Sequence, residues 1–185
     1  MSAENYGQLL LAVLAAGVVA AAWGWSRVGL RVWAPAAVAL LAAAALLAAL
    51  PGRVDLTGHP GRTALVTLAG VLAVLGGGPV TSRVFALVDR DEQPAQSMDR
   101  AGQVLRGGAW IGALERAAVF AALTAGWPEG LAVVLALKGL GRYPELRAAE
   151  TGVRTGAAER FIIGTFTSVL WAVGCAGVVV LALRR

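Results

Sequence analysis

Residues 32–50 of the chain read VWAPAAVALLAAAALLAAL, a stretch without a charged side chain that is long enough to cross the hydrocarbon core of a bilayer as a helix. Pro35 lies in its first turn, where a missing backbone N–H costs little, and Pro51-Gly52 ends it. Similar apolar runs lie on both sides of this stretch, at residues 8–25, 63–75, 107–126, 130–143 and 160–183. The runs predict an all-α fold, a polytopic bundle of about six transmembrane helices.

The composition also indicates a membrane protein. Of 185 residues, 58% are hydrophobic and 15% are charged, whereas a soluble domain carries about 25% charged residues. The net charge of +5 comes mainly from Arg residues between the apolar runs, where membrane orientation and lipid head groups explain them better than nucleic acid does. Cys175 and His59 each occur alone, so we expect no disulfide, no metal site and no cofactor.

A glycine-rich segment interrupts the first half of the chain. Gly76-Gly77-Gly78-Pro79 is expected to end or kink the third helix, because Gly and Pro weaken a helix from within. We therefore expect residues 80–88 to form a short interfacial helix on the membrane surface. The hydrophilic loop 89–106 then separates residues 1–88, which are apolar, from residues 107–185, which carry intramembrane charges.

The distribution of Arg predicts the orientation in the membrane. Six helices place both termini on one side, and the loops of the opposite side carry ten Arg residues: Arg27, Arg31, Arg83, Arg90, Arg100, Arg106, Arg142, Arg147, Arg154 and Arg160. The side of the termini carries four: Arg53, Arg62, Arg184 and Arg185. Because basic residues accumulate in cytoplasmic loops, we expect a multi-pass membrane protein with both termini outside the cytoplasm. The heavy use of Ala, Gly and Arg is typical of a GC-rich bacterial genome, so the membrane that we expect is the bacterial cytoplasmic (inner) membrane.

Ionisable side chains fall inside the predicted helices mainly in the second half of the chain. Charges at membrane depth cost about 2.5–3.5 kcal/mol each, so they should face protein and be paired. Glu115 lies twelve residues before Trp127 and Lys138 eleven residues after it. At about 1.5 Å per residue, both lie roughly 16–18 Å from that turn. The spacing predicts a Glu115–Lys138 pair.

Four more residues complete the predicted intramembrane polar cluster: Arg116, Arg142, Thr165 and Ser168. Thr165 and Ser168 enter the last helix far enough to share the layer of the pair, and Arg142 lies one turn beyond the lysine. Arg116 lies about 100° around the helix from its neighbour Glu115, so one partner does not serve both well. The partner of Arg116 is left open between backbone carbonyls and a neighbouring chain.

Small residues near these charges are expected to mediate helix packing. Gly108 and Gly112 form an i, i+4, i+7 stripe with the glutamate of the pair, which lets another helix approach closely. We assign the same role to Gly139 and Gly141 in the following helix and to Gly164 in the last one.

Three strings in the second half carry a resemblance. Residues 110–116 read WIGALER, Lys138 is followed by Arg142-Tyr143, and residues 159–165 read ERFIIGT with Ser168 after them. Together they resemble the membrane part of an uncharacterised bacterial membrane-protein family with the pattern IG-x-LER, K-x-x-x-R-aromatic and E-x-F-x-IGT-x-x-S, over residues 107–170. That family has no assigned activity, so the resemblance implies a membrane location and supplies no reaction. The matching positions are Gly112, Glu115, Arg116, Lys138, Arg142, Glu159, Gly164, Thr165 and Ser168.

The polar cluster admits a structural and a functional interpretation. A buried ion-pair network can fix the packing of the last three helices, and an intramembrane charge can equally mark a binding site. We favour a non-enzymatic module that binds or passes a small charged species or an anionic lipid head group at the Glu115/Lys138 layer. The chain contains no GxxxxGK[ST], HExxH or GxSxG sequence, which are signatures of nucleotide-binding and hydrolytic sites.

Two other functions stay open. One is an accessory subunit of a larger membrane complex in which the charges are purely structural. The other is an intramembrane lipid-modifying enzyme that uses Glu115 as a general base. The expected partners are membrane lipids, a second copy of the chain or a larger membrane complex, and not nucleic acid.

Overall fold

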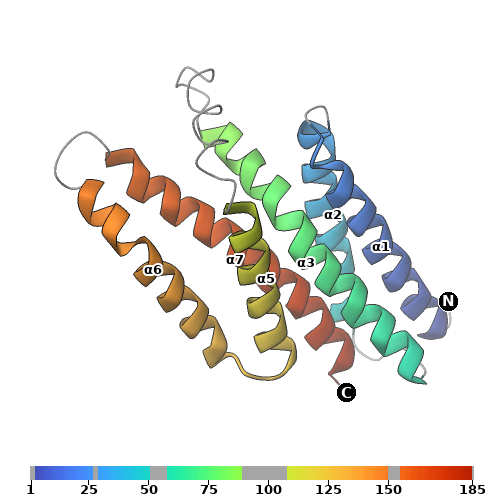
Figure 1. Ribbon diagram of the computed structural model, residues 1–185. Helices are drawn as coiled ribbons and strands as arrows, with labels where there is room; N and C mark the ends of the chain where they lie inside the picture. The colour runs from blue at the N-terminus through green and yellow to red at the C-terminus, as the bar shows by residue number, and fades with distance from the viewer. Residues whose placement is uncertain (1–2, 27–28, 51–57, 89–107, 150–154, 185) are drawn as a thin grey trace.

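The structure, a computed structural model, describes residues 3–26, 29–50, 58–88, 108–149 and 155–184, and these form six α-helices and no strand (Figure 1). The helices are α1 (Ala3–Trp23), α2 (Leu30–Ala49), α3 (Gly58–Val88), α5 (Gly108–Thr124), α6 (Glu129–Ala149) and α7 (Thr155–Leu183). Consecutive helices run antiparallel, so the two ends of the chain lie at the same end of the bundle (Figure 1). The predicted all-α fold is confirmed.

Helices α3 and α7 form the middle of the bundle. α3 packs against α1, α2, α5 and α7, and α7 also packs against α2, α5 and α6. α6 lies at one edge, where it packs mainly against α5 and less extensively against α7 (Figure 1). Side chains from distant parts of the chain therefore meet on α3.

The interior and the outer surface of the bundle are both apolar. Leu10, Leu65 and Leu72 are fully buried in the core, whereas Leu46 is 71% exposed and Leu114 is 68% exposed. α1, α2, residues 59–88 of α3 and residues 159–183 of α7 are long and apolar enough to cross a membrane. Large apolar side chains on the outside of such helices are expected where lipid is the solvent, so the structure indicates a membrane protein.

α3 passes through the glycine-rich segment without a break, so the predicted interfacial helix at residues 80–88 is wrong. Pro79 lacks the N–H that would donate to the carbonyl oxygen of Leu75. The indole Nε1 of Trp25 donates to that oxygen instead, at 3.0 Å. Val80 is part of the buried core, and residues 80–88 are the last turns of α3. The Trp25 indole therefore replaces the hydrogen bond that Pro79 cannot donate within α3.

Three helices, α3, α6 and α7, are longer than the apolar runs that predicted them. α3 begins at Gly58, five residues before the predicted start, and α6 continues to Ala149 beyond the predicted end at Tyr143. α7 begins at Thr155 rather than at Arg160. The added turns combine Gly, Ala and Pro with a few polar residues, His59, Arg62, Glu145, Arg147, Thr155 and Glu159. Hydropathy does not assign such turns to a membrane helix, although they can extend one outside the hydrocarbon core. The predicted loop 89–106 lies outside the described residues.

Candidate functional site

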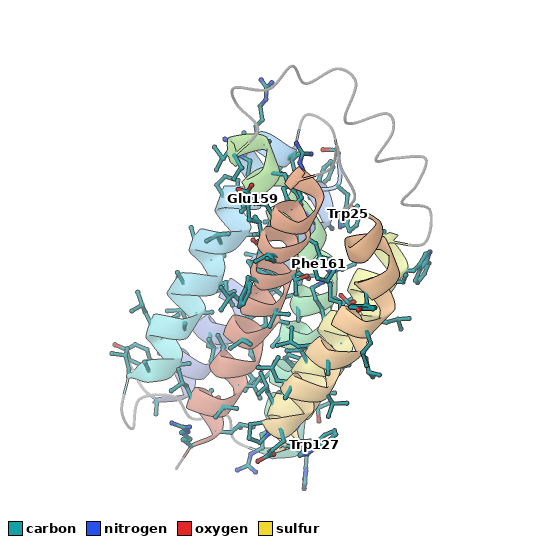
Figure 2. All side chains as sticks on the ribbon, turned by 90° about the vertical axis from the view of Figure 1, so that its left-hand side faces the viewer. Trp25, Trp127, Glu159 and Phe161 are labelled. Carbon is teal, nitrogen blue, oxygen red and sulfur yellow. The ribbon has the colours of Figure 1, made fainter. Side chains whose placement is uncertain are left out.

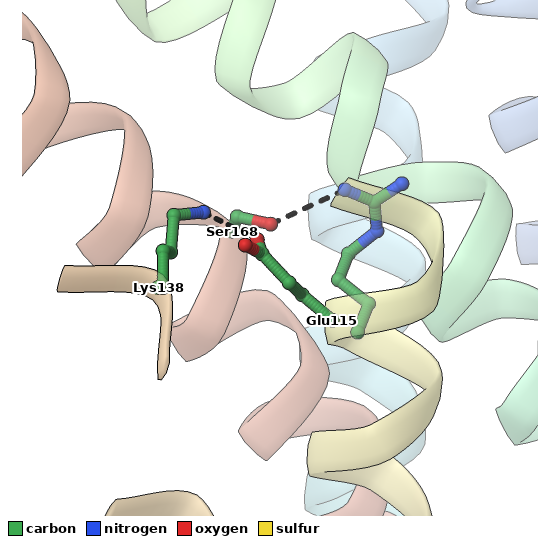
Figure 3. Close-up of polar contacts among 4 residues, drawn as sticks. Glu115, Lys138 and Ser168 are labelled. Carbon is green, nitrogen blue, oxygen red and sulfur yellow. Dashed lines mark hydrogen bonds and ion pairs between the residues drawn. The ribbon is translucent and has the colours of Figure 1, made fainter. Parts of the chain in front are cut away.

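Glu115 of α5 and Lys138 of α6 form the predicted ion pair (Figure 3). The turn between the two helices explains why they meet. Gly126 has a φ of 77°, and the N–H of Trp127 donates to the carbonyl of Ala122 at 2.9 Å, which is a glycine-terminated helix end. The chain then returns antiparallel, so similar spacings from the turn place the charges at one level. Lys138 is 18% exposed and Glu115 is 16% exposed.

Arg116 is more deeply buried than the ion pair, with 5% of its surface exposed. Its Nε and Nη2 donate to the carbonyl oxygen of Val74 on α3 at 3.1 and 2.7 Å. Its Nη1 donates to Ser168 Oγ on α7 at 3.2 Å (Figure 3). The sequence left the partner of Arg116 open between backbone carbonyls and a neighbouring chain, and the structure shows a backbone carbonyl. These acceptors are neutral, so they satisfy the guanidinium hydrogen bonds without cancelling its charge.

The three glycines before Pro79, which we call the glycine triplet, make room for side chains that bind α3. An added Cβ would clash with a different donor side chain at each position: with Trp171 at Gly76, with Arg116 at Gly77 and with Trp25 at Gly78. These donors bind three carbonyls of the same helix: Trp171 binds that of Leu72, Arg116 that of Val74 and Trp25 that of Leu75. The triplet therefore belongs to the site.

Sequence reasoning missed the glycine triplet and the two tryptophans, Trp25 and Trp171, as site residues. The available signal was the position of three consecutive glycines inside an apolar stretch, since glycine in a membrane helix often permits a close approach by a neighbour. We interpreted the segment as a break because glycine and proline weaken helices locally.

A cavity of about 870 Å³ lies beside this network, between the α1–α2 turn, α3, α5, α6 and α7. Its charged lining, among the described residues, is Glu115, Arg116, Lys138 and Arg160. Its hydroxyl lining is Ser26, Thr81, Ser82, Thr165 and Ser168, and much of the rest is apolar. Trp25 and Phe161 line the cavity and lie toward the end of the bundle opposite Trp127 (Figure 2). The cavity thus occupies the half of the bundle nearer the α1–α2 turn.

Two hydroxyls in the lining have no hydrogen-bond partner within the described chain. Thr165 of α7 is 8% exposed, and its Oγ1 is fully buried and unpartnered. Thr81 Oγ1 on α3 is buried and unpartnered as well. A buried hydroxyl without a partner costs about 1–3 kcal/mol, and most buried polar groups in folded proteins are satisfied. Both threonines contribute to the cavity lining, so their hydroxyls are polar groups beside the cavity whose hydrogen-bonding capacity is unused.

The predicted packing glycines behave differently from one another. Gly164 is tightly packed, since an added Cβ would stand 3.0 Å from Phe85 of α3. At Gly112 an added Cβ would stand 3.1 Å from the Arg116 guanidinium, so this glycine makes room within its own helix. Around Gly139 and Gly141 no atom lies within 4 Å of an added Cβ, so within the described chain they do not mediate helix packing. Gly108, Gly112, Gly141 and Gly164 line the cavity.

The remaining predictions concern Arg142 and metal binding. Arg142 lies on α6, and its side chain is outside the part that the structure describes. Among the described residues, no group of three or more His, Cys, Asp and Glu side chains is placed to hold a metal ion.

No protein-family model, curated protein or solved structure matches the chain. The resemblance of residues 107–170 to an uncharacterised family therefore stays a prediction.

Proposed function

We propose that the protein spans the bacterial cytoplasmic membrane with six helices and binds a small anionic group, without chemical turnover, in the cavity beside the Glu115–Lys138 pair. The observation that supports this most is an excess of positive charge. The Glu115–Lys138 pair in the lining is close to neutral as a unit, and Arg116 adds a buried positive charge whose hydrogen-bond acceptors are neutral. A bound anion would reduce this excess in a place that is poorly solvated.

Arg116 contributes most to the expected attraction. Its guanidinium is buried and bound to the neutral oxygens of Val74 and Ser168, so its charge is available to a ligand. At 4 Å, opposite unit charges attract by about 4 kcal/mol for an effective dielectric constant of 20. Thr81 and Thr165 belong to the same lining, and we propose that a rotation of their side chains turns the buried, unpartnered hydroxyls toward the anion as additional donors.

The ion pair itself is close to neutral as a unit. Glu115 would repel an anion, but Lys138 binds its carboxylate directly and offsets its charge. The same contact favours a binding role over the general-base role, because the carboxylate is already engaged by a cation. The cavity of about 870 Å³ beside the ion pair, together with an Arg116 guanidinium bound only to neutral oxygens, favours a ligand site over an accessory subunit whose charges serve packing alone.

The antiparallel arrangement supports six spans. α5 and the apolar part of α6, residues 129–143, measure about 25 and 22 Å at 1.5 Å per residue, somewhat less than the roughly 30 Å of the hydrocarbon core, and we propose that they cross it as an antiparallel hairpin packed against α7. The cavity lies toward the α1–α2 turn, at the end of the bundle that holds more of the described Arg residues: Arg31, Arg83, Arg142, Arg147 and Arg160, against Arg62 and Arg184 at the other end. Under the positive-inside rule this end faces the cytoplasm, so we propose that the anion enters from the cytoplasmic half of the membrane.

The test uses the full-length protein in a nonionic detergent, with sodium glycerol 1-phosphate as the anionic probe and sodium chloride of equal ionic strength as the reference. We expect the probe to raise the midpoint of thermal unfolding. A concentration of 100 times Kd stabilises by about 2.7 kcal/mol, which corresponds to roughly 5–10 °C for a chain of this size. Thr165→Val should weaken binding about tenfold, because it removes a donor to a charged group and preserves the shape of the side chain.

Thr167→Val is the matched control, since it removes a hydroxyl from the same helix outside the cavity lining. Its response to glycerol 1-phosphate should equal that of the unchanged protein. Equal stabilisation by glycerol 1-phosphate and by sodium chloride would contradict anion binding. Equal affinities of the two threonine variants would place the anion outside this cavity.

A further inference from the structure

The wall of the cavity is continuous with the outer surface of α5 and α6. Leu114 of α5 is 68% exposed and Leu137 of α6 is 65% exposed, yet both side chains line the cavity. Ile111, one turn before Leu114, is also exposed and also lines it. In a membrane these surfaces face lipid, so the cavity opens sideways into the bilayer as well as containing buried polar groups.

We propose that the anionic ligand is a phospholipid, with its phosphate near Arg116 and Thr165 and its acyl chains passing over Leu114 and Leu137 into the bilayer. This inference rests on the proposed function and names the class of its ligand. A water-soluble anion would need only the polar part of the lining. The apolar lining and its exposure on the lipid-facing side suit a molecule that is both anionic and acylated.

The size of the cavity supports a ligand larger than an isolated phosphate. Its volume of about 870 Å³ falls in the range of about 300–1,000 Å³ that holds drug-sized organic molecules. Phe85, Phe161 and Val134 supply apolar surface on three helices around it. A glycerophosphate head group with the first part of its acyl chains would fill such a space, and the rest of the chains would stay in the membrane.

The charge of the lining selects among phospholipids. Arg116 adds a buried positive charge beside the Glu115–Lys138 pair, so the described lining carries an excess of positive charge at this layer. An anionic head group such as that of phosphatidylglycerol lowers this excess, whereas the zwitterionic head group of phosphatidylcholine brings an additional cation into it. We therefore expect a preference for the anionic lipid, as for basic pockets between membrane helices that bind anionic head groups.

The experiment measures lipid retention by native mass spectrometry. The full-length protein in a nonionic detergent receives equal amounts of phosphatidylglycerol and phosphatidylcholine with identical acyl chains. We expect phosphatidylglycerol to be retained about tenfold better. Gly141→Leu should abolish most of this preference, because it fills a lining position where no atom lies within 4 Å of an added Cβ. Gly139→Leu, which is equally free of neighbours but outside the lining, should preserve it.

The outcomes separate this inference from the proposed function. Stabilisation by glycerol 1-phosphate without a preference for phosphatidylglycerol would leave the anion site standing and overturn the lipid assignment. A preference that both glycine variants retain equally would place the lipid on the outer surface and also overturn it. The absence of both effects would overturn the proposed function together with the inference. If Gly141→Leu does not fold, Thr165→Val against Thr167→Val supplies the same comparison.

Discussion

The indole Nε1 of Trp25 donates a hydrogen bond of 3.0 Å to the carbonyl oxygen of Leu75 on α3. In a regular helix this oxygen would accept from the N–H of residue 79, which is proline. The turn between α1 and α2 thus supplies a hydrogen bond that α3 cannot make for itself. Arg116 and Trp171 donate to two earlier carbonyls of the same helix. Residues 72–75 of α3 therefore accept hydrogen bonds from the α1–α2 turn, α5 and α7.

Trp25→Phe tests this contact, since it keeps an aromatic ring and removes the donor. We expect a loss of about 1 kcal/mol, or a decrease of roughly 2–4 °C in the midpoint of thermal unfolding, because the Leu75 carbonyl is left unsatisfied. In a Pro79→Ala background the helix supplies its own N–H, so the same substitution should cost clearly less. Equal losses in the two backgrounds would show that the hydrogen bond does not compensate for the proline.

Gly77→Ala should destabilise the protein by roughly 1–3 kcal/mol, because the added methyl group overlaps the Arg116 side chain in a packed interior. Gly139→Ala is the matched control. It adds the same group where no atom lies within 4 Å, and replacing a glycine inside a helix should stabilise by about 0.5–1 kcal/mol. Thermal unfolding in detergent measures both, and a Gly77→Ala variant as stable as the control would contradict the role of the glycine triplet.

Substitutions of Glu115 and Lys138 should have coupled effects on stability. Glu115→Gln or Lys138→Met alone leaves one charge without its partner, so each should lower stability, and the double substitution should recover part of the loss. Since both side chains keep some exposure, we expect a coupling free energy of roughly 1–3 kcal/mol. The four proteins of the cycle are compared by thermal unfolding in detergent. Strictly additive losses would mean that the contact contributes nothing to stability.

We expect Thr165→Val to have opposite effects on stability and on binding. Without ligand, the variant should be at least as stable as the unchanged protein and up to about 1 kcal/mol more stable, because an unpartnered buried hydroxyl is replaced by a methyl group. Ser168→Ala provides the contrast, since that hydroxyl accepts from Arg116 and its removal should destabilise. A clear loss of stability in Thr165→Val would show that the hydroxyl has a structural partner.

Membrane orientation can be measured with matched cysteine probes in a Cys175→Ala background, which removes the buried native thiol. Glu129→Cys lies beside the Trp127 turn, and Glu159→Cys lies near the opposite end of the bundle (Figure 2). In intact spheroplasts, a membrane-impermeant maleimide should label position 129 and not position 159, because the Arg-rich end is expected in the cytoplasm. Labelling of position 159 alone would reverse the orientation.

Features that depend on position along one helix, or along one hairpin, were predictable from the sequence. The apolar runs predicted the helices because burial in lipid requires continuous hydrophobicity over a defined length. The Glu115–Lys138 pair was predictable because the rise of a helix is constant and a tight turn sets both residues at the same level. Neither prediction depends on how the first three helices pack against the last three.

The tertiary structure alone decided the role of the glycine triplet, the partner of Arg116 and the cavity. Arg116 and Val74 are separated by 42 residues, and Trp171 and Leu72 by 99. Glycine and proline have poor helix propensity, so local reasoning predicts a break between residues 75 and 80. The helix continues because donors from α5, α7 and the α1–α2 turn bind its carbonyls, and those contacts exist only after the helices have packed together.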